Sequence, residues 1–115
     1  MAKFSFVRSA AGVATSTTDQ VIELTPTGNP RLICYDRITV VDKTSAVTSV
    51  IIGFKSGARE FILGGSASPG AGIPVAIQGK IYVSGDYRPF ARLVGCVAGD
   101  SIELYAFGYD SDLLE

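Results

Sequence analysis

The chain has 115 residues, a formal net charge of −1 at pH 7 and 18% charged residues, fewer than a typical globular protein has. This length predicts one domain with its own hydrophobic core and excludes a second core. The near-neutral charge and the scattered Lys and Arg residues exclude an extended basic surface, and no apolar run is long enough for a membrane-spanning helix. We therefore expect no nucleic-acid partner and no membrane partner.

The first twenty residues differ from the rest of the chain. Between Ser9 and Thr18 they are small and polar, and they lack the sustained alternation of a strand. We expect residues 1–20 to form an extended N-terminal arm and residues 21–115 to form a β-sandwich domain. The arm is either a loose terminus or a segment anchored on a neighbouring subunit by Phe4 and Phe6. Polar residues interrupt every apolar run of the arm that could serve as the core of a signal peptide, so we expect synthesis in the cytoplasm.

From residue 20 onward, runs rich in β-branched residues alternate with turn-forming segments, and none has the period of a helix. The runs are 21–24, 31–41, 46–55, 59–63, 73–83, 88–97 and 101–109. Gly79 either marks a bulge or divides its run into two strands of different sheets. With that division the strands number eight. The sequence thus predicts an all-β, antiparallel, jelly-roll-like sandwich, with an immunoglobulin-like sandwich or a small barrel as alternatives.

Alternation within the runs predicts which side chains face inward. In 46–55 the apolar residues Val50, Ile52 and Phe54 share one face. In 73–83 the odd-numbered apolar residues share a face, and these are Ile73, Val75, Ile77, Ile81 and Val83. Both strands are therefore expected to have one buried and one wet side.

The connections carry their own predictions. A two-residue hairpin loop is expected within 55–58, centred on Ser56 and Gly57, because Gly57 can supply a positive φ. The glycine-rich segment 64–72 is expected to be a mobile loop, since it lacks the spacing and the following helix of a phosphate-binding loop. Val83–Asp86 and Val97–Asp100 share the form apolar, small, Gly, Asp, which indicates turns rather than calcium ligands.

The residues that usually carry catalysis or bind metal are scarce. The chain has no histidine, and its two cysteines, Cys34 and Cys96, lie in apolar runs and are expected to be free and buried. Asp86, Asp100 and Glu103 are the only candidates for a catalytic carboxylate pair that lie near one another in sequence. Since no pattern places one of them beside a perturbing neighbour, we expect no enzymatic activity, no cofactor and no metal.

The last run is apolar on both faces. Its aliphatic face consists of Ile102, Leu104, Ala106 and Gly108, and its aromatic face contains Tyr105, Phe107 and Tyr109. Either face can fill the sandwich, and the other then needs a cover, as an interface does. Arg88, Phe90 and Arg92 share a face of the preceding run and are expected to flank the aromatic row. The candidate interface residues are Phe4, Phe6, Arg88, Phe90, Arg92, Tyr105, Phe107 and Tyr109.

The order of elements from residue 36 to residue 110 resembles small jelly-roll virion proteins of tailed bacteriophages, and above all their capsid decoration or cement proteins. The resemblance lies in a strand ending at Gly85-Asp86, a second turn at Gly99-Asp100 and an aromatic closing strand ending in Gly108-Tyr109-Asp110. It implies a homo-oligomer, a dimer or trimer, made in the host cytoplasm and located on the capsid exterior of the virion. There it would bind the major capsid protein and stabilise the head non-covalently.

Two other functions remain open. One is a carbohydrate- or receptor-binding module of a virion fibre, with Tyr82, Tyr87, Tyr105 or Tyr109 as a stacking platform. The other is a head–tail connector subunit.

Overall fold

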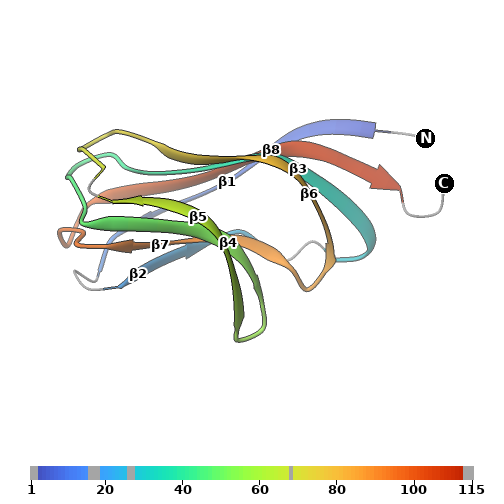
Figure 1. The fold of residues 1–115 in the computed structure, drawn as a ribbon, viewed down its shortest axis with the longest axis horizontal. Coiled ribbons are helices and arrows are strands. Elements are labelled where there is room, and N and C mark those ends of the chain that lie inside the picture. The colour runs from blue at the N-terminus through green and yellow to red at the C-terminus, as the bar shows by residue number, and fades with distance from the viewer. Residues whose placement is uncertain (1–2, 16–18, 26–27, 68, 113–115) are drawn as a thin grey trace.

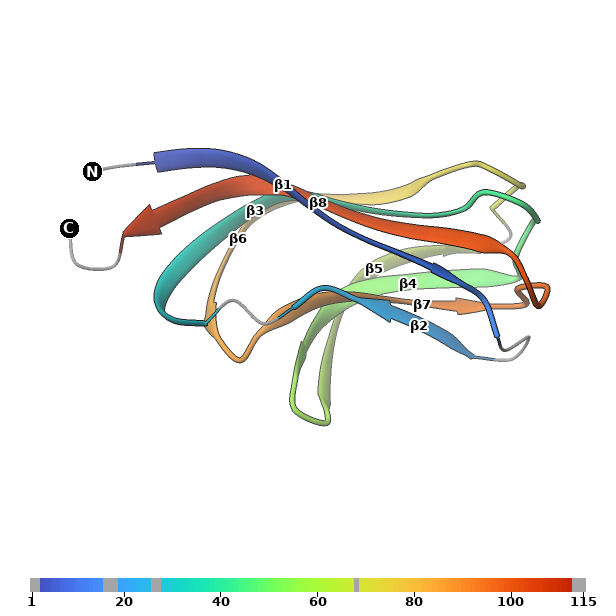
Figure 2. The same ribbon diagram turned by 180° about the vertical axis from the view of Figure 1, so that it is seen from behind.

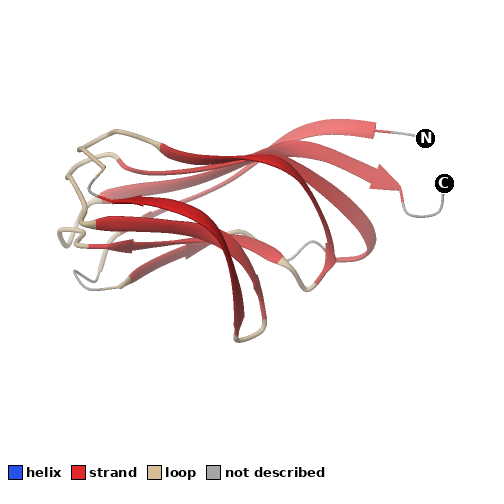
Figure 3. Ribbon diagram, in the orientation of Figure 1, coloured by secondary structure: helices blue, strands red, loops and turns tan. Residues whose placement is uncertain are grey.

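Eight β-strands make up the computed structural model, which describes residues 3–15, 19–25, 28–67 and 69–112 and contains no helix among them (Figures 1 and 3). The strands are β1 (Lys3–Val13), β2 (Gln20–Glu23), β3 (Gly28–Asp42), β4 (Ser49–Ser56), β5 (Arg59–Ala67), β6 (Val75–Gly85), β7 (Arg88–Val94) and β8 (Ser101–Asp112). A membrane-spanning helix is therefore absent from the described residues.

The strands form two four-stranded antiparallel sheets. Sheet A has the order β1-β8-β3-β6 and sheet B the order β2-β7-β4-β5. The pairs β1–β8, β2–β7, β3–β6 and β4–β5 are all neighbours, so the chain doubles back at the β4–β5 turn and the resulting ribbon rolls into two layers. This is the jelly-roll topology, and the predicted fold is confirmed.

The predicted arm is a strand over most of its length. Strand β1 pairs with β8 in an unbroken register from Lys3 with Ser111 to Val13 with Ser101, and forms one edge of sheet A (Figure 2). Its small residues hide the alternation that identifies the other strands, but an edge strand can be stabilised by one neighbour's backbone. The side chains of Phe4 and Phe6 lie outside the described part, so their anchoring role stays a prediction.

Strand β6 is continuous, so the predicted division at Gly79 is wrong and β1 is the eighth strand. Gly79 has a φ of 143° and lies in a bulge, where the register with β3 shifts between the pairs Tyr35–Ile81 and Arg37–Gln78. The alternative prediction, a bulge, is confirmed. The bulge lets β6 stay in sheet A although its alternation is interrupted.

The core lies between the sheets. Val50, Ile52 and Phe54 are buried as predicted, and Val75, Ile77, Ile81 and Val83 pack against them from sheet A. Ile73 instead precedes β6 and is 57% exposed. On β8 the aliphatic face fills the core, with Ile102, Leu104 and Ala106 buried, which settles the alternative left open by the sequence.

Glycines shape the turns and close contacts. The hairpin between β4 and β5 is confirmed, but its central residues are Gly57 (φ 60°) and Ala58, because Ser56 still pairs with Arg59. The prediction of a loop from residue 64 is wrong for its first four residues, which belong to β5. A Cβ on Gly65 would lie 2.1 Å from the carbonyl oxygen of Val50, so these glycines allow close packing.

Candidate interaction surfaces

The candidate residues of β7 and β8 lie on opposite outer faces of the sandwich. Arg88, Phe90 and Arg92 share the outer face of sheet B, while Tyr105 and Phe107 share that of sheet A. The prediction that the first group flanks the second is wrong. In a jelly roll β7 and β8 follow each other in the chain but enter different sheets.

The outer face of sheet B covers its aromatic residue with cations. Phe90 is fully buried although it points away from the core. The Lys55 Nζ and the Arg92 guanidinium carbon each lie 5.8 Å from the centroid of its ring. Both distances fit a cation–π contact, so two aliphatic stems and two charges form a lid over Phe90.

Acids hold these cations in place. Glu23 pairs with Lys55 and with Arg88, both at 3.1 Å, and Glu60 accepts a hydrogen bond from Arg92 at 2.7 Å. The hydrogen bond from Arg92 lowers the pKa of Glu60, and the same contact raises the pKa of Arg92. These five charged side chains thus pair with one another, which leaves little of their charge for a partner to bind.

The outer face of sheet A leaves apolar groups uncovered. Phe107 is 40% exposed, and Tyr82 on β6 is 55% exposed. On the edge strand β1, Val7 and Val13 are also exposed, and Val7 pairs directly with Phe107. This face, rather than that of sheet B, has the composition of an interaction surface.

Tyr109 closes one part of the sheet A face. Its hydroxyl lies 3.2 Å from that of Tyr82, and hydrogen bonds with the Cys34 thiol and with Tyr82 raise the pKa of Tyr109. Cys34 is fully buried beneath these rings, and Cys96 is buried on the core side, so both thiols are free as predicted. Of the predicted aromatic row, Tyr109 is therefore the member most engaged within the chain.

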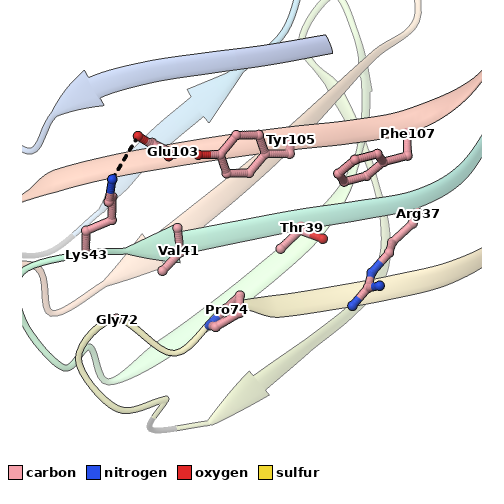
Figure 4. A pocket seen from close by; sticks show the side chains of 9 residues that line it. All are labelled: Arg37, Thr39, Val41, Lys43, Gly72, Pro74, Glu103, Tyr105 and Phe107. Carbon is pink, nitrogen blue, oxygen red and sulfur yellow. Dashed lines mark hydrogen bonds and ion pairs between the residues drawn. The ribbon is translucent and has the colours of Figure 1, made fainter. Parts of the chain in front are cut away.

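A groove of about 480 Å³ crosses the sheet A face (Figure 4). Tyr105 and Phe107 project into it from β8, and Thr39 and Val41 from β3. An ion pair closes one end, where the Lys43 Nζ lies 3.4 Å from a Glu103 oxygen, and Arg37 lies at the other end. The lining residues are Arg37, Thr39, Val41, Lys43, Gly72, Pro74, Glu103, Tyr105 and Phe107.

The exposed edge of sheet B was not among the predicted surfaces. On β5 the consecutive residues Phe61, Ile62 and Leu63 are 38%, 51% and 48% exposed. Tyr87 extends this patch, with its ring centroid 5.9 Å from that of Phe61. A signal was present in the sequence, because three consecutive apolar residues in a strand point to both faces and only one face can be buried.

Of the predicted carboxylate candidates, Asp86 and Asp100 lie beyond opposite ends of β7. Asp86 lies at the β6–β7 turn and accepts a hydrogen bond from the Ser56 hydroxyl at 3.1 Å, whereas Asp100 lies beyond the other end of β7. The turn at 97–100 is confirmed, since the Asp100 N–H donates to the Val97 carbonyl at 3.0 Å and Gly99 has a φ of 95°. Within the described residues no group of three potential metal ligands is found.

Asp100 has a buried partner that sequence reasoning missed. Asp42, at the end of β3, accepts hydrogen bonds from the backbone of Thr44 and Ser45, and both acids are almost fully buried. Burial and the contact with Asp100 raise the pKa of Asp42, while the hydrogen bond from Asp42 lowers the pKa of Asp100. A protonated Asp42 beside an ionised Asp100 accounts for both directions. Beside them, burial raises the pKa of Cys96 to about 11.

No protein-family model matches the chain. No curated protein is significantly similar to it in sequence.

Proposed function

We propose that this protein is a structural subunit of a virion, a capsid decoration or cement protein that binds the major capsid protein and its own copies without covalent bonds. The resemblance of its strand and turn order to such proteins supports the assignment. The jelly-roll topology fits it, although this fold serves many functions.

The observation that carries the proposal is the apolar edge of sheet B. Among the described strands, β5 has a neighbour, β4, on one side only (Figure 1). Its consecutive apolar residues Phe61, Ile62 and Leu63 are exposed. Natural β-proteins usually protect such an edge with charge, proline or a cover. A second copy supplies that cover, because two β5 strands can pair antiparallel about a two-fold axis and bury their apolar side chains.

Stabilisation of the shell then follows from mass action. A subunit that binds neighbouring capsid proteins only when they are correctly arranged lowers the free energy of the assembled state. A dimer or trimer of such subunits binds more than one capsid site at once, which raises the effective concentration of the second contact. This mechanism uses surfaces rather than reactive groups.

Light scattering on the purified chain tests self-association. The wild-type protein should have two or three times the monomer mass of 12.1 kDa at micromolar concentration. Ile62→Lys should give a monomer, because the edge would then carry a charge that cannot be buried in the pair. Val97→Lys is the matched control, since Val97 is a similarly exposed apolar residue at 55% in the β7–β8 connection. A monomeric wild-type protein would contradict the proposal.

Copy number tests the virion role. Purified particles should contain the protein over the whole shell, and shells that lack it should dissociate at a lower temperature. A single ring of copies per particle would indicate a connector subunit instead.

A further inference from the structure

The groove on the outer face of sheet A suits a ligand that the proposed function does not require. It is lined by β3, β8 and the segment before β6, whereas the proposed self-association edge belongs to sheet B. Binding in this groove therefore depends neither on the oligomeric state nor on a capsid.

The floor of the groove presents aromatic surface to solvent. Tyr105 and Phe107 are two residues apart on β8, so their rings leave the same side of the sheet about 7 Å apart along the strand. Thr39 and Pro74 complete the floor with further apolar area (Figure 4). Adjacent aromatic rings of this kind can stack against ring-shaped ligands that have an apolar face.

The two ends of the groove supply polar groups of different kinds. Arg37 is exposed and makes no hydrogen bond or ion pair with another described side chain. Its planar guanidinium presents a fork of donors that matches a carboxylate. At the other end, Lys43 and Glu103 offer a donor and an acceptor that already hold each other at 3.4 Å. The lining therefore has two cations and one acid, which favours an anionic ligand.

The backbone around the groove argues against an extended peptide. Strands β3 and β8 each have neighbours on both sides, so their N–H and C=O groups are used within the sheet. Pro74 has no N–H, and the N–H of Gly72 donates to the Asp42 carbonyl at 2.9 Å. A peptide in the groove would therefore gain no backbone pairing from the sheet, unlike a peptide that adds to a sheet edge. A saccharide, by contrast, is recognised through side chains that stack on its ring and bond to its hydroxyls.

We propose that this groove binds an acidic saccharide, a glycan that bears a carboxylate group. Sugar rings stack on Tyr105 and Phe107, and the carboxylate pairs with the Arg37 guanidinium. Hydroxyl groups of the glycan reach the Thr39 hydroxyl and the Lys43–Glu103 pair.

A glycan array with sialylated, uronic-acid-containing and neutral glycans tests the proposal, followed by calorimetric titration of the best glycan and of its neutral counterpart. We expect at least about tenfold tighter binding of the acidic glycan, the equivalent of one charge-assisted hydrogen bond or ion pair. Arg37→Gln should remove that preference, and Phe107→Ala should weaken the binding of both glycans. Tyr87→Ala, which removes an exposed tyrosine away from the groove, should change neither.

Several results would overturn the proposal. These are an array without signal, equal binding of acidic and neutral glycans, an unchanged preference in Arg37→Gln, or loss of binding in Tyr87→Ala. Binding of a poly-glutamate peptide as tight as that of the glycan would also overturn it and indicate a protein partner. Because Arg37 is exposed, its variant should keep the wild-type thermal unfolding temperature, which checks that the fold is intact. Ile62→Lys should still bind the glycan, so failure of the proposed self-association leaves this test unaffected.

Discussion

The outer faces of the two sheets differ in how far they bury an aromatic side chain. Phe90 on sheet B is fully buried, whereas Phe107 on sheet A is 40% exposed, although both side chains point away from the core. The difference comes from the neighbouring strands. Glu60 on β5 holds Arg92 over Phe90, while no described acid holds Arg37 over Phe107. Exposure of a side chain outside the core is thus decided by residues distant in sequence.

Truncation of the two phenylalanines should show the largest contrast between the faces. Phe90→Ala should lower the free energy of unfolding by about 3–5 kcal/mol, because it leaves a cavity beneath the ion pairs. Phe107→Ala should cost less than about 1 kcal/mol, since much of the ring already contacts water. Urea denaturation of both variants measures the two values. Equal losses would mean that the two faces are covered alike.

A second contrast is that between the buried carboxyl pair, Asp42 and Asp100, and the charged side chains on the surface. The pKa of Asp42 is raised above 3.8, so its contribution to stability is complete below that pH and is lost as the pH rises through the raised value. An Asn side chain at position 42 can donate a hydrogen bond to Asp100 without needing a proton. Asp42→Asn should therefore unfold at a higher temperature than the wild-type protein at pH 7, with little difference near pH 4.

Asp36→Asn is the control for this change, because Asp36 is an exposed acid of the same strand. It should have little effect at either pH. A lower unfolding temperature for Asp42→Asn at pH 7 would show that Asp42 is ionised in the native state and needed as an acceptor.

Lowering the pH should affect the ion pairs on the outer faces of the two sheets differently. The pKa of Glu60 is lowered from 4.5, so its contribution is present above that pH and is lost as the pH falls through the lower native value. Glu60→Gln should unfold at a lower temperature at pH 7 and show a shallower decline in acid. Glu103→Gln makes the same change on sheet A. If the unfolding temperature of Glu103→Gln declined in acid as little as that of Glu60→Gln, the two faces would not differ in this respect.

The smallest effect is expected at the ion pair of the groove. The Lys43 side chain is 54% exposed, so its contact with Glu103 is screened by water and salt. Lys43→Met should change the free energy of unfolding by about 0–1 kcal/mol, as for exposed pairs in general. A larger loss in urea denaturation would mean that the sheet A face depends on charge as sheet B does.

Sequence reasoning identified the fold because the strands of the core alternate clearly. Val50, Ile52 and Phe54 show a pattern that burial on one side of a strand requires, and Gly57 and Gly99 mark turns that need a positive φ. Strand β1 was missed since small residues such as Ala10 and Gly12 show no such pattern. Its place is set by backbone pairing with β8, which local sequence does not encode.

The surfaces were harder to predict than the core. The sequence correctly grouped the outward residues of β7 and of β8, but it could not place the two strands in different sheets without the topology. The pair of Asp42 and Asp100 was missed for a similar reason. Their 58-residue separation is closed only when β3 and β8 lie side by side, as the register of Asp42 with Ile102 shows.

The rolled ribbon also sets the order in which the protein can fold. The β4–β5 hairpin closes over two residues, whereas the outermost pair joins Lys3 to Ser111. On the ribosome, β1 therefore has to wait unpaired until β8 has been synthesised, and sheet A cannot form its central strand pair before then. Such distant pairings fold slowly and expose strand edges meanwhile.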